Sequence, residues 1–372
     1  MKILQKSNWK AFNKAIKLKP EDIIKKIKNS GLTGRGGANF PTGKKWKITR
    51  NAEGKEKYLI CNAHESEPGT FKDKFIIENN PENLIEGIAI ASYAIGINKA
   101  IIYFKHGYPN LAKKLKKTIA IAKTKLKKIN LEIEMIRGAG AYICGEATAI
   151  IDSIEGLRAE PRKKPPYPSE KGFFNKPTCV NNVETLANVP LIFIDKGWNK
   201  NLRLFSVSGN VKKPGVYELP LGTPVKELLE KVQPKNPVKA LYFGCAGGCI
   251  TPEGNLGKEE IENKGAMLGN CSIIVVNDKE DIVDIAKNIA EFFVHESCGK
   301  CTPCREGTFR IVEILEEISN GNATKKELAL LEELSNIIYE TSFCGLGKVS
   351  TLHLITALKY FRKEFEAKCK LK

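Results

Sequence analysis

Short strand-like runs alternate with longer helical stretches in the amino-terminal part of the chain. Runs rich in β-branched and aromatic residues cover 57–61, 99–104 and 131–136, and apolar residues at helical spacing fill 82–96 and 109–129. Strands separated by helices in this way predict a parallel sheet covered by helices. Loops that follow such strands gather at the carboxyl edge of the sheet, which is where open parallel sheets bind ligands.

The rest of the chain predicts two further domains. Residues 204–210 and 215–219 alternate apolar and polar side chains on either side of a Pro-Gly turn, which predicts a hairpin. From Asp281 onward, apolar residues recur at helical spacing. We therefore expect an α/β domain over residues 1–200, a smaller domain with strands over 201–280 and a helical domain over 281–372.

The net charge of the chain is strongly positive. There are 60 Lys and Arg residues against 42 Asp and Glu residues, which gives +18. Such an excess is compatible with nucleic acid, an anionic surface or an acidic partner. Most lysines between residues 109 and 129 fall opposite the apolar face of the expected helix, as is typical of an ordinary solvated surface. No nucleic-acid partner is therefore expected.

The chain has no apolar stretch long enough to cross a membrane, and its start lacks the pattern of a secretory signal. We therefore expect no direct membrane span and a cytoplasmic protein, either free or at the cytoplasmic face of a membrane complex. Eleven cysteines in such a chain favour metal binding or redox chemistry over a disulfide framework.

Four of these cysteines have the spacing of a metal-cluster site. Cys298, Cys301 and Cys304 form a C-x2-C-x2-C pattern, and Cys344 supplies a fourth thiol in Phe-Cys-Gly-Leu-Gly. Three thiolates at this spacing wrap one iron–sulfur cube, whereas zinc normally uses two separate pairs. We interpret the four cysteines as ligands of a [4Fe–4S] cluster, with a zinc site or unligated thiols as the alternatives.

Two glycine-rich loops suggest a bound phosphate. Residues 34–46 begin Gly-Arg-Gly-Gly and interleave cations with aromatics, and residues 138–145 follow an expected strand and open a helix. Glycines let the backbone approach a phosphate closely, although neither loop has Walker or Rossmann spacing and the first is also compatible with a surface turn. Together with the acidic turn 64–69 and the cluster, they indicate a flavin, which joins two-electron to one-electron chemistry.

A wider resemblance rests on six segments, among them Asn-Ala-His-Glu-Ser-Glu-Pro-Gly from Asn62. The segments are 34–46, 61–73, 138–149, 164–168, 180–185 and 296–308. Together they resemble the NADH-binding flavoprotein subunit of respiratory complex I and its relatives in NAD(P)-linked hydrogenases, formate dehydrogenases and bifurcating enzymes. The similarity runs from about Trp9 to Phe365, which is nearly the whole chain.

The resemblance implies FMN, a [4Fe–4S] cluster and NAD(H) or NADP(H) as cofactors, and a hydride transfer that needs no catalytic side chain. It implies an α/β parallel-sheet FMN domain, a β-grasp domain of the soluble-ligand-binding type and a C-terminal helical bundle that carries the cluster. The residues implied in FMN binding are Gly34, Arg35, Gly36, Lys45, Asn62, His64, Glu65, Tyr142, Gly145, Glu146, Asn181 and Asn182. The residues implied in NAD(P)H binding are Phe40, Glu67, Ala147, Lys164 and Tyr167.

The resemblance also implies partners: a thioredoxin-like [2Fe–2S] subunit and further iron–sulfur subunits of a larger complex. In such a complex the chain passes electrons between a nicotinamide dinucleotide and the cluster, in either direction. Two other classes of protein stay open from the residues alone. One is a zinc-containing nucleic-acid-binding protein, and the other is a scaffold subunit that has kept the fold and lost its cofactors.

Two residues depart from the pattern of the family. His64 stands where the family usually carries Asp, which removes a carboxylate beside the flavin and would make the flavin easier to reduce. Ala147 stands where a second Glu normally follows Glu146, and such an acid repels the 2′-phosphate of NADP. Our hypothesis is that this chain accepts NADPH, unless another acid takes over that role.

Overall fold

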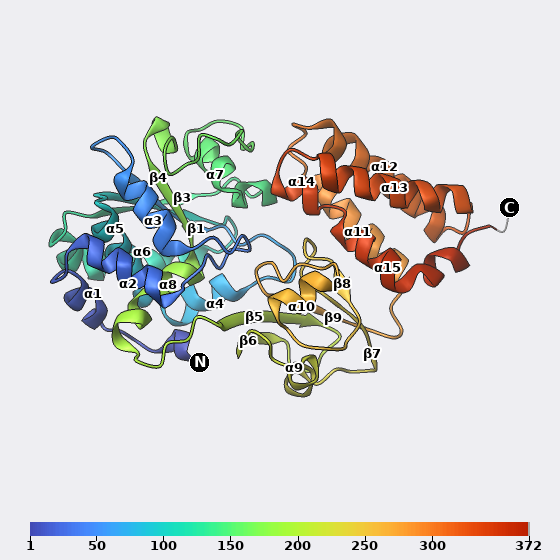
Figure 1. Cartoon of the computed structure of the whole chain (residues 1–372), viewed down its shortest axis with the longest axis horizontal. Coiled ribbons are helices and arrows are strands. Elements are labelled where there is room, and N and C mark those ends of the chain that lie inside the picture. Colours follow the sequence, from blue (N-terminus) through green and yellow to red (C-terminus); the bar gives the residue numbers. More distant parts are fainter. Residues whose placement is uncertain (371–372) are drawn as a thin grey trace. The chain divides into compact units, whose positions relative to one another are not determined.

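Two units make up residues 1–370 of the chain, which a computed structural model describes (Figure 1). Unit 1 consists of residues 1–66 and 71–202, and unit 2 consists of residues 67–70 and 203–372. Unit 2 thus contains both of the later segments that the sequence predicts as separate domains, and a boundary near residue 280 stays a prediction.

A four-stranded parallel sheet forms the centre of unit 1. Its strand order is β3-β2-β1-β4, and its strands are β1 (Tyr58–Ala63), β2 (Lys99–Phe104), β3 (Glu132–Arg137) and β4 (Thr178–Asn182). Three of these strands and the parallel arrangement agree with the expectation from the sequence. We did not predict β4, because a five-residue strand that ends in two asparagines has little β-propensity.

Helices pack on this sheet and on one another. α2 (Pro20–Ser30) begins with proline in its first turn and ends at Gly31, whose φ of 72° is the left-handed conformation that favours glycine. α5 (Pro81–Ile95) approaches α8 (Val183–Ile194) so closely that a Cβ atom at Gly87 would lie 2.0 Å from the carbonyl oxygen of Leu186. The other helices of unit 1 are η1 (Lys2–Leu4), α1 (Lys10–Ala15), α3 (Thr42–Asn51), α4 (Lys72–Asn79), α6 (Pro109–Lys127), η2 (Tyr142–Gly145), α7 (Ala147–Ile154) and η3 (Phe173–Asn175).

Unit 2 contains a mixed five-stranded sheet with the order β6-β5-β9-β7-β8. β5 (Leu202–Gly209) runs parallel to β9 (Ser272–Asn277), and β7 (Val238–Tyr242) runs antiparallel to β9. The predicted neighbours β5 and β6 do lie side by side in the sheet. The remaining elements of this part are β6 (Gly215–Pro220), α9 (Val225–Val232), β8 (Cys249–Ile250) and α10 (Lys258–Asn263).

Helices complete unit 2, as the periodicity after Asp281 predicts. Asp281 begins α11 (Ile282–Glu296) by accepting hydrogen bonds from the backbone N–H groups of Val283 and Asp284, at 2.8 and 3.3 Å. The other helices are α12 (Thr302–Ser319), α13 (Lys325–Thr341), α14 (Gly345–Val349) and α15 (Leu352–Ala367). No helix within residues 1–370 is both long and apolar enough to span a membrane.

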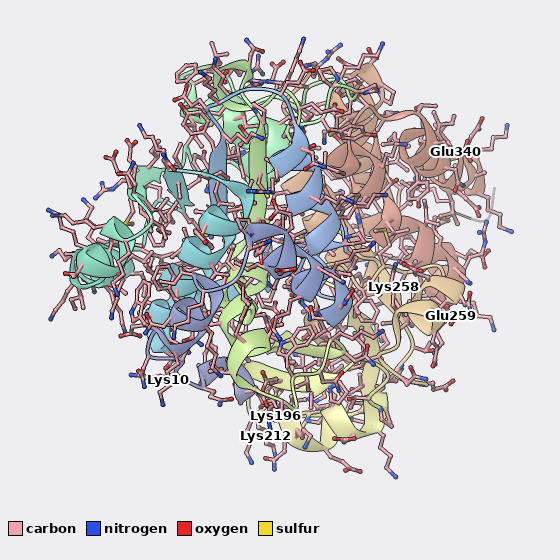
Figure 2. All side chains as sticks on the ribbon, turned by 60° about the vertical axis from the view of Figure 1, so that its left-hand side comes forward. Lys10, Lys196, Lys212, Lys258, Glu259 and Glu340 are labelled. Carbon is pink, nitrogen blue, oxygen red and sulfur yellow. The ribbon has the colours of Figure 1, made fainter. Side chains whose placement is uncertain are left out.

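The charged side chains mostly point outward. Figure 2 shows Lys10, Lys212 and Glu259 extending from the ribbon. In α6, Leu115 and Leu126 are buried while the lysines are largely exposed. This helix therefore has the ordinary amphipathic surface that its sequence predicts.

Candidate functional site

The carboxyl edge of the parallel sheet brings several predicted site residues together. Asn62 near the end of β1 is the register neighbour of Asn182 at the end of β4. The Nδ2 atom of Asn62 donates a hydrogen bond to the carbonyl oxygen of Gly145 at 3.0 Å. One asparagine therefore ties the central strand to the second glycine loop, which follows β3.

The first glycine loop lies against the start of α8. The backbone N–H of Arg35 donates to Oγ1 of Thr185 at 2.8 Å. A Cβ atom at Gly36 would lie 3.3 Å from Cβ of Asn182, so the loop backbone passes close to that side chain. The first glycine loop thus meets β4 and α8, and the second meets β1, the paired neighbour of β4. Ligands of open parallel sheets bind at this carboxyl edge.

Two polar contacts anchor α3 to β4. Nζ of Lys45 donates to the carbonyl oxygen of Val180 at 2.9 Å, and burial lowers the pKa of this lysine. Nε1 of Trp46 donates to Oδ1 of Asn181 at 3.0 Å. The side-chain oxygen of Asn181 therefore holds the buried tryptophan in place.

A cluster of buried charges lies beside these residues, and the sequence did not reveal it. Lys72 is 1% exposed, and its Nζ atom lies 2.9 Å from Oδ1 of Asp73 and 3.0 Å from Oε2 of Glu184. Although burial opposes it, the two carboxylates raise the pKa of Lys72 above its ordinary value. Asp73 also accepts a hydrogen bond from Nδ2 of Asn182, so the cluster fixes a predicted FMN residue.

Glu65 is placed by the start of α4. Its two carboxylate oxygens each accept a backbone N–H, from Asp73 and from Lys74, both at 2.9 Å. Burial and the neighbouring Asp73 carboxylate raise the pKa of Glu65. Its side chain therefore caps a helix in addition to any contact with a cofactor.

Glu146 has a similar position at the start of α7. Its Oε2 atom accepts the backbone N–H groups of Thr148 and Ala149, and its Oε1 atom lies 2.5 Å from Nζ of Lys164. Although burial opposes it, the hydrogen bonds from Lys164 and Thr148 hold the pKa of Glu146 below its ordinary value. Ala147, the first residue of α7, presents only a half-buried methyl group beside this pair.

The predicted nicotinamide residues are distributed over both units. Phe40 and Tyr167 of unit 1 are 39% and 54% exposed, so both aromatic side chains are accessible within that unit. Glu67 belongs to unit 2, where its carboxylate accepts hydrogen bonds from Nδ2 of Asn270 at 2.6 Å and from the backbone N–H of Ala246 at 3.2 Å. No sequence pattern indicated these two partners, because they lie far away along the chain.

The four predicted cluster ligands meet at helix ends in unit 2. Cys298 follows α11, Cys301 precedes α12, Cys304 lies in the first turn of α12 and Cys344 precedes α14. Burial raises the pKa of the Cys304 thiol to about 11, and the three other cysteines contribute to that shift. The four thiols are therefore near enough to influence one another electrostatically.

The chemistry of this donor set fits an iron–sulfur cluster. All four donors are thiols, and each comes from a different position around the ends of three helices. The irons of a four-iron cube each take a different cysteine, so its ligands surround a volume larger than one ion. Within residues 1–370, no three His, Cys, Asp or Glu side chains are grouped tightly enough to hold a single metal ion.

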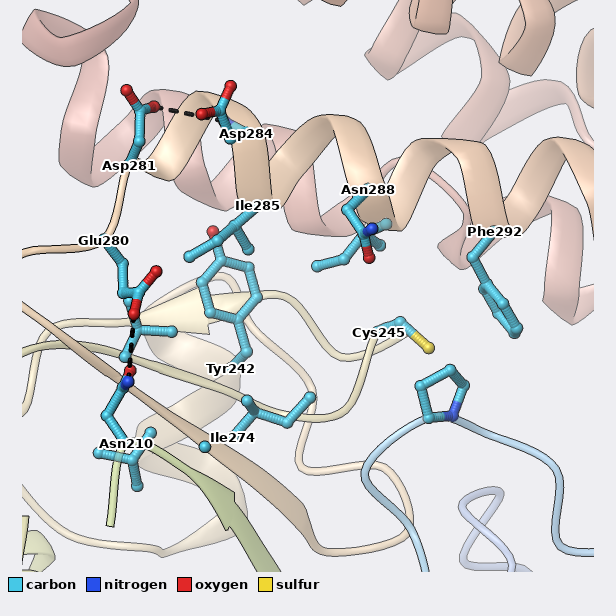
Figure 3. Close-up of a pocket in the computed structure, with 15 residues that line it drawn as sticks. Asn210, Tyr242, Cys245, Ile274, Glu280, Asp281, Asp284, Ile285, Asn288 and Phe292 are labelled. Carbon is cyan, nitrogen blue, oxygen red and sulfur yellow. Dashed lines mark hydrogen bonds between the residues drawn. The ribbon is translucent and has the colours of Figure 1, made fainter.

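A separate cavity of about 500 Å³ lies within unit 2, between the strands and α11 (Figure 3). Its acidic residues already have partners: Glu280 accepts from Asn210 at 3.1 Å, and Asp281 lies 2.7 Å from Nζ of Lys368. The cavity lining contains none of the residues predicted to bind a cofactor. We therefore do not assign a cofactor to it.

Three family models match this chain. Residues 27–191 match the Nuo51 FMN-binding domain, residues 204–232 match the SLBB domain, and residues 284–368 match the NADH-ubiquinone oxidoreductase-F iron-sulfur binding region. These matches confirm the predicted FMN and [4Fe–4S] cofactors. They give no support to a zinc-containing nucleic-acid-binding protein.

Whole-chain relatives agree with these matches. An NADH-quinone oxidoreductase subunit of Aquifex aeolicus is 46% identical, over 98% of this chain and 89% of that protein. The corresponding NADH-quinone oxidoreductase subunit of Rhizobium meliloti is 42% identical, over 96% and 91%. The NADP-reducing hydrogenase subunit HndC of Solidesulfovibrio fructosivorans is 35% identical, over 96% and 78%.

A solved structure supports the fold. A chain of the NAD+-reducing [NiFe]-hydrogenase in its H2-reduced state superposes with a TM-score of 0.89 and is 36% identical, over 95% of this chain. The present chain spans 63% of the length of that hydrogenase chain. The predicted order of a parallel α/β domain, a second sheet and carboxyl-terminal helices is thereby confirmed.

Proposed function

This chain belongs to the family of NADH-binding flavoprotein subunits of NADH-quinone oxidoreductases, and we propose which of its residues carry that function. The observation that supports the proposal best is the meeting of both glycine loops with Asn62 and Asn182 at one edge of the sheet. When bound, FMN exchanges a hydride with the nicotinamide and single electrons with the cluster.

The protein's part in this chemistry is to bind and orient. We propose that Gly34, Gly36 and Gly145 form the walls of the FMN site, because they allow backbone to approach the ligand without side chains. At Gly145, a Cβ atom would meet nothing nearer than the carbonyl oxygen of His64, at 4.0 Å. Lys45 supplies a cation beside β4 for the phosphate. No side-chain acid or base is assigned, because hydride transfer depends on stacking and orientation.

We propose Cys298, Cys301, Cys304 and Cys344 as the cluster ligands. Burial raises the pKa of Cys344, and the backbone N–H groups of Gly347 and Leu346 partly oppose that shift. Such amides at a helix start favour a thiolate and an anionic cluster. A Cβ atom at Gly347 would lie 3.3 Å from Cβ of Cys304, so this glycine lets the two ligand-bearing segments approach.

We propose that NADPH is a substrate as well as NADH. The carboxylate of Glu146 is already paired with Lys164 at 2.5 Å, and position 147 carries no acid that would repel a 2′-phosphate. The sequence similarity to an NADP-reducing hydrogenase subunit supports the same proposal. Phe40 and Tyr167 are proposed to contact the dinucleotide, and a role of Glu67 stays a prediction from the resemblance.

The chain is a subunit of a multi-subunit complex, as its relatives are. We further propose that a thioredoxin-like [2Fe–2S] subunit and other iron–sulfur subunits are its partners. We also propose that it acts in the cytoplasm, alone or at the cytoplasmic face of a membrane complex. No disulfide joins any of the cysteines within residues 1–370, which is compatible with a reducing compartment.

One kinetic experiment tests this function. The chain, reconstituted without oxygen with FMN, iron and sulfide, is mixed with NADH or with NADPH, and the reduction of an artificial electron acceptor is followed. We expect turnover with both nucleotides, at kcat/KM values within about tenfold of each other, which corresponds to about 1.4 kcal/mol. A loaded protein that oxidises neither nucleotide would contradict the function, and a strong preference for NADH would contradict only the NADPH proposal.

A further inference from the structure

His64 has an unusual position for a histidine at the edge of a sheet. The residue follows β1 and is 4% exposed. Its Nε2 atom lies 3.0 Å from the carbonyl oxygen of Ala141, in the second glycine loop. Since a carbonyl oxygen only accepts hydrogen bonds, Nε2 of His64 carries the hydrogen and donates a hydrogen bond to the carbonyl of Ala141.

The neighbour Asn62 makes the second connection to the same loop. Its Oδ1 atom accepts the backbone N–H of His64 at 3.1 Å, and its Nδ2 atom donates to the carbonyl oxygen of Gly145 at 3.0 Å. The turn after β1 therefore holds the loop at two carbonyl groups, Ala141 and Gly145. These two bonds hold the loop at the start and at the end of η2.

The start of the loop fits against the histidine ring. A Cβ atom at Gly138 would lie 2.5 Å from Nδ1 of His64 and 2.9 Å from two ring atoms of Tyr103. The rings of His64 and Tyr103 lie 5.3 Å apart, and the Tyr103 hydroxyl accepts the backbone N–H of Ala139 at 3.1 Å. Only glycine therefore fits at position 138 while these two rings keep their places.

We propose that His64 is a positioning residue that holds the loop 138–145 in the shape that binds FMN, and that it acts through Ala141 rather than by touching the flavin. This inference rests on the proposed function, in which that loop forms part of the FMN site. Without the imidazole donor, the Ala141 carbonyl loses its partner and the loop has further conformations to populate. FMN binding then has to select one of them, which weakens the affinity.

The charge state of His64 agrees with this role. Burial lowers the pKa of His64 and outweighs the opposing hydrogen bond to Ala141, and the positive charge of Lys105 adds to the lowering. The ring is therefore neutral near pH 7 and has one N–H to give. That single donor is the one which faces Ala141.

Two variants of similar size separate the hydrogen bond from the packing. His64→Gln keeps a donor near the position of Nε2, and His64→Leu fills the space without a donor. The purified chain is stripped of FMN, and its dissociation constant is measured by the quenching of flavin fluorescence. We expect His64→Gln to bind FMN within about threefold of the unmodified chain and His64→Leu to bind about tenfold more weakly.

The matched control is His106→Ala, because His106 is exposed and follows the neighbouring strand β2; its FMN affinity should not change. If His64→Leu does not fold, His64→Asn replaces it, since the shorter amide does not reach the Nε2 position. The proposal would be overturned if His64→Leu bound FMN as tightly as the unmodified chain. It would also be overturned if His64→Gln and His64→Leu lost the same amount of FMN affinity. If the unmodified chain binds no FMN, the proposed function fails instead.

Discussion

Replacing Lys72 with methionine should destabilise unit 1 strongly. The side chain of Lys72 is 1% exposed and lies within 3.0 Å of carboxylate oxygens from Asp73 and Glu184, which are themselves 6% and 3% exposed. Lys72→Met keeps most of the side-chain volume and removes the charge. Two carboxylates then remain buried without their cation. Asp73 also loses the ion pair that helps to orient its carboxylate toward Asn182.

The distances give the size of the effect. At an effective dielectric constant of about 20, each of the two contacts at 2.9 and 3.0 Å is worth about 6 kcal/mol before any cost of desolvation. Most of that gain is offset by taking the ions out of water, and breaking a buried pair typically costs about 3 to 5 kcal/mol. We therefore expect a loss of about 3 to 5 kcal/mol in the free energy of unfolding of unit 1.

The three tryptophans make this measurable, because Trp9, Trp46 and Trp198 all lie in unit 1. Urea unfolding of the FMN-loaded protein is followed by tryptophan fluorescence, and the shift in midpoint is multiplied by the common slope. The control is Lys74→Met, whose partly exposed side chain lies 3.8 Å from Glu78 and should contribute less than about 1 kcal/mol. A loss below about 1 kcal/mol in Lys72→Met would show that the buried charges of Asp73 and Glu184 do not depend on this lysine.

Three further predictions concern specificity, pH and the cluster. Ala147→Glu should lower kcat/KM for NADPH about tenfold or more while leaving NADH nearly unchanged, and equal losses with both nucleotides in dye-reduction assays would contradict this. Burial lowers the pKa of His353 from 6.5 to about 3, so between these pH values the unfolded chain binds a proton at this residue and the native chain does not. The stability of unit 2 should therefore fall as the pH drops from 6.5 toward 3. In His353→Gln, urea unfolding followed by circular dichroism should show a smaller dependence of stability on pH. Cys344→Ser should lower the iron content per chain after reconstitution, whereas Cys369→Ser should leave it unchanged; equal iron in both would argue against Cys344 as a ligand.

Local patterns in the sequence predicted the elements well. β2 has the bounds that its β-branched run predicts, and α6 begins at Pro109, where the helical spacing of 109–129 predicts it. Proline, glycine and apolar spacing act within a few residues, so they can be read from the sequence alone. The cysteine spacing likewise predicted a [4Fe–4S] cofactor, which the family match confirms, because a cluster imposes short intervals between its ligands.

Long-range polar contacts could not be predicted in the same way. The partner of Lys72 in α8, Glu184, is more than a hundred residues away in the sequence, and nothing in a Lys-Asp pair shows that it will be buried. Glu67 is similar, since its partner Asn270 lies two hundred residues further on. Such pairs depend on which surfaces the folded chain brings together, and periodicity reveals only which face of an element is apolar.

Chemical analysis of the reconstituted protein shows whether the chain holds both FMN and an iron–sulfur cluster. FMN released by denaturation, iron, acid-labile sulfide and zinc are each measured per polypeptide. We expect one FMN together with four iron atoms and four sulfides, as a [4Fe–4S] flavoprotein requires, and no stoichiometric zinc. A protein that retains no flavin, or that holds zinc in place of iron, would contradict this expectation.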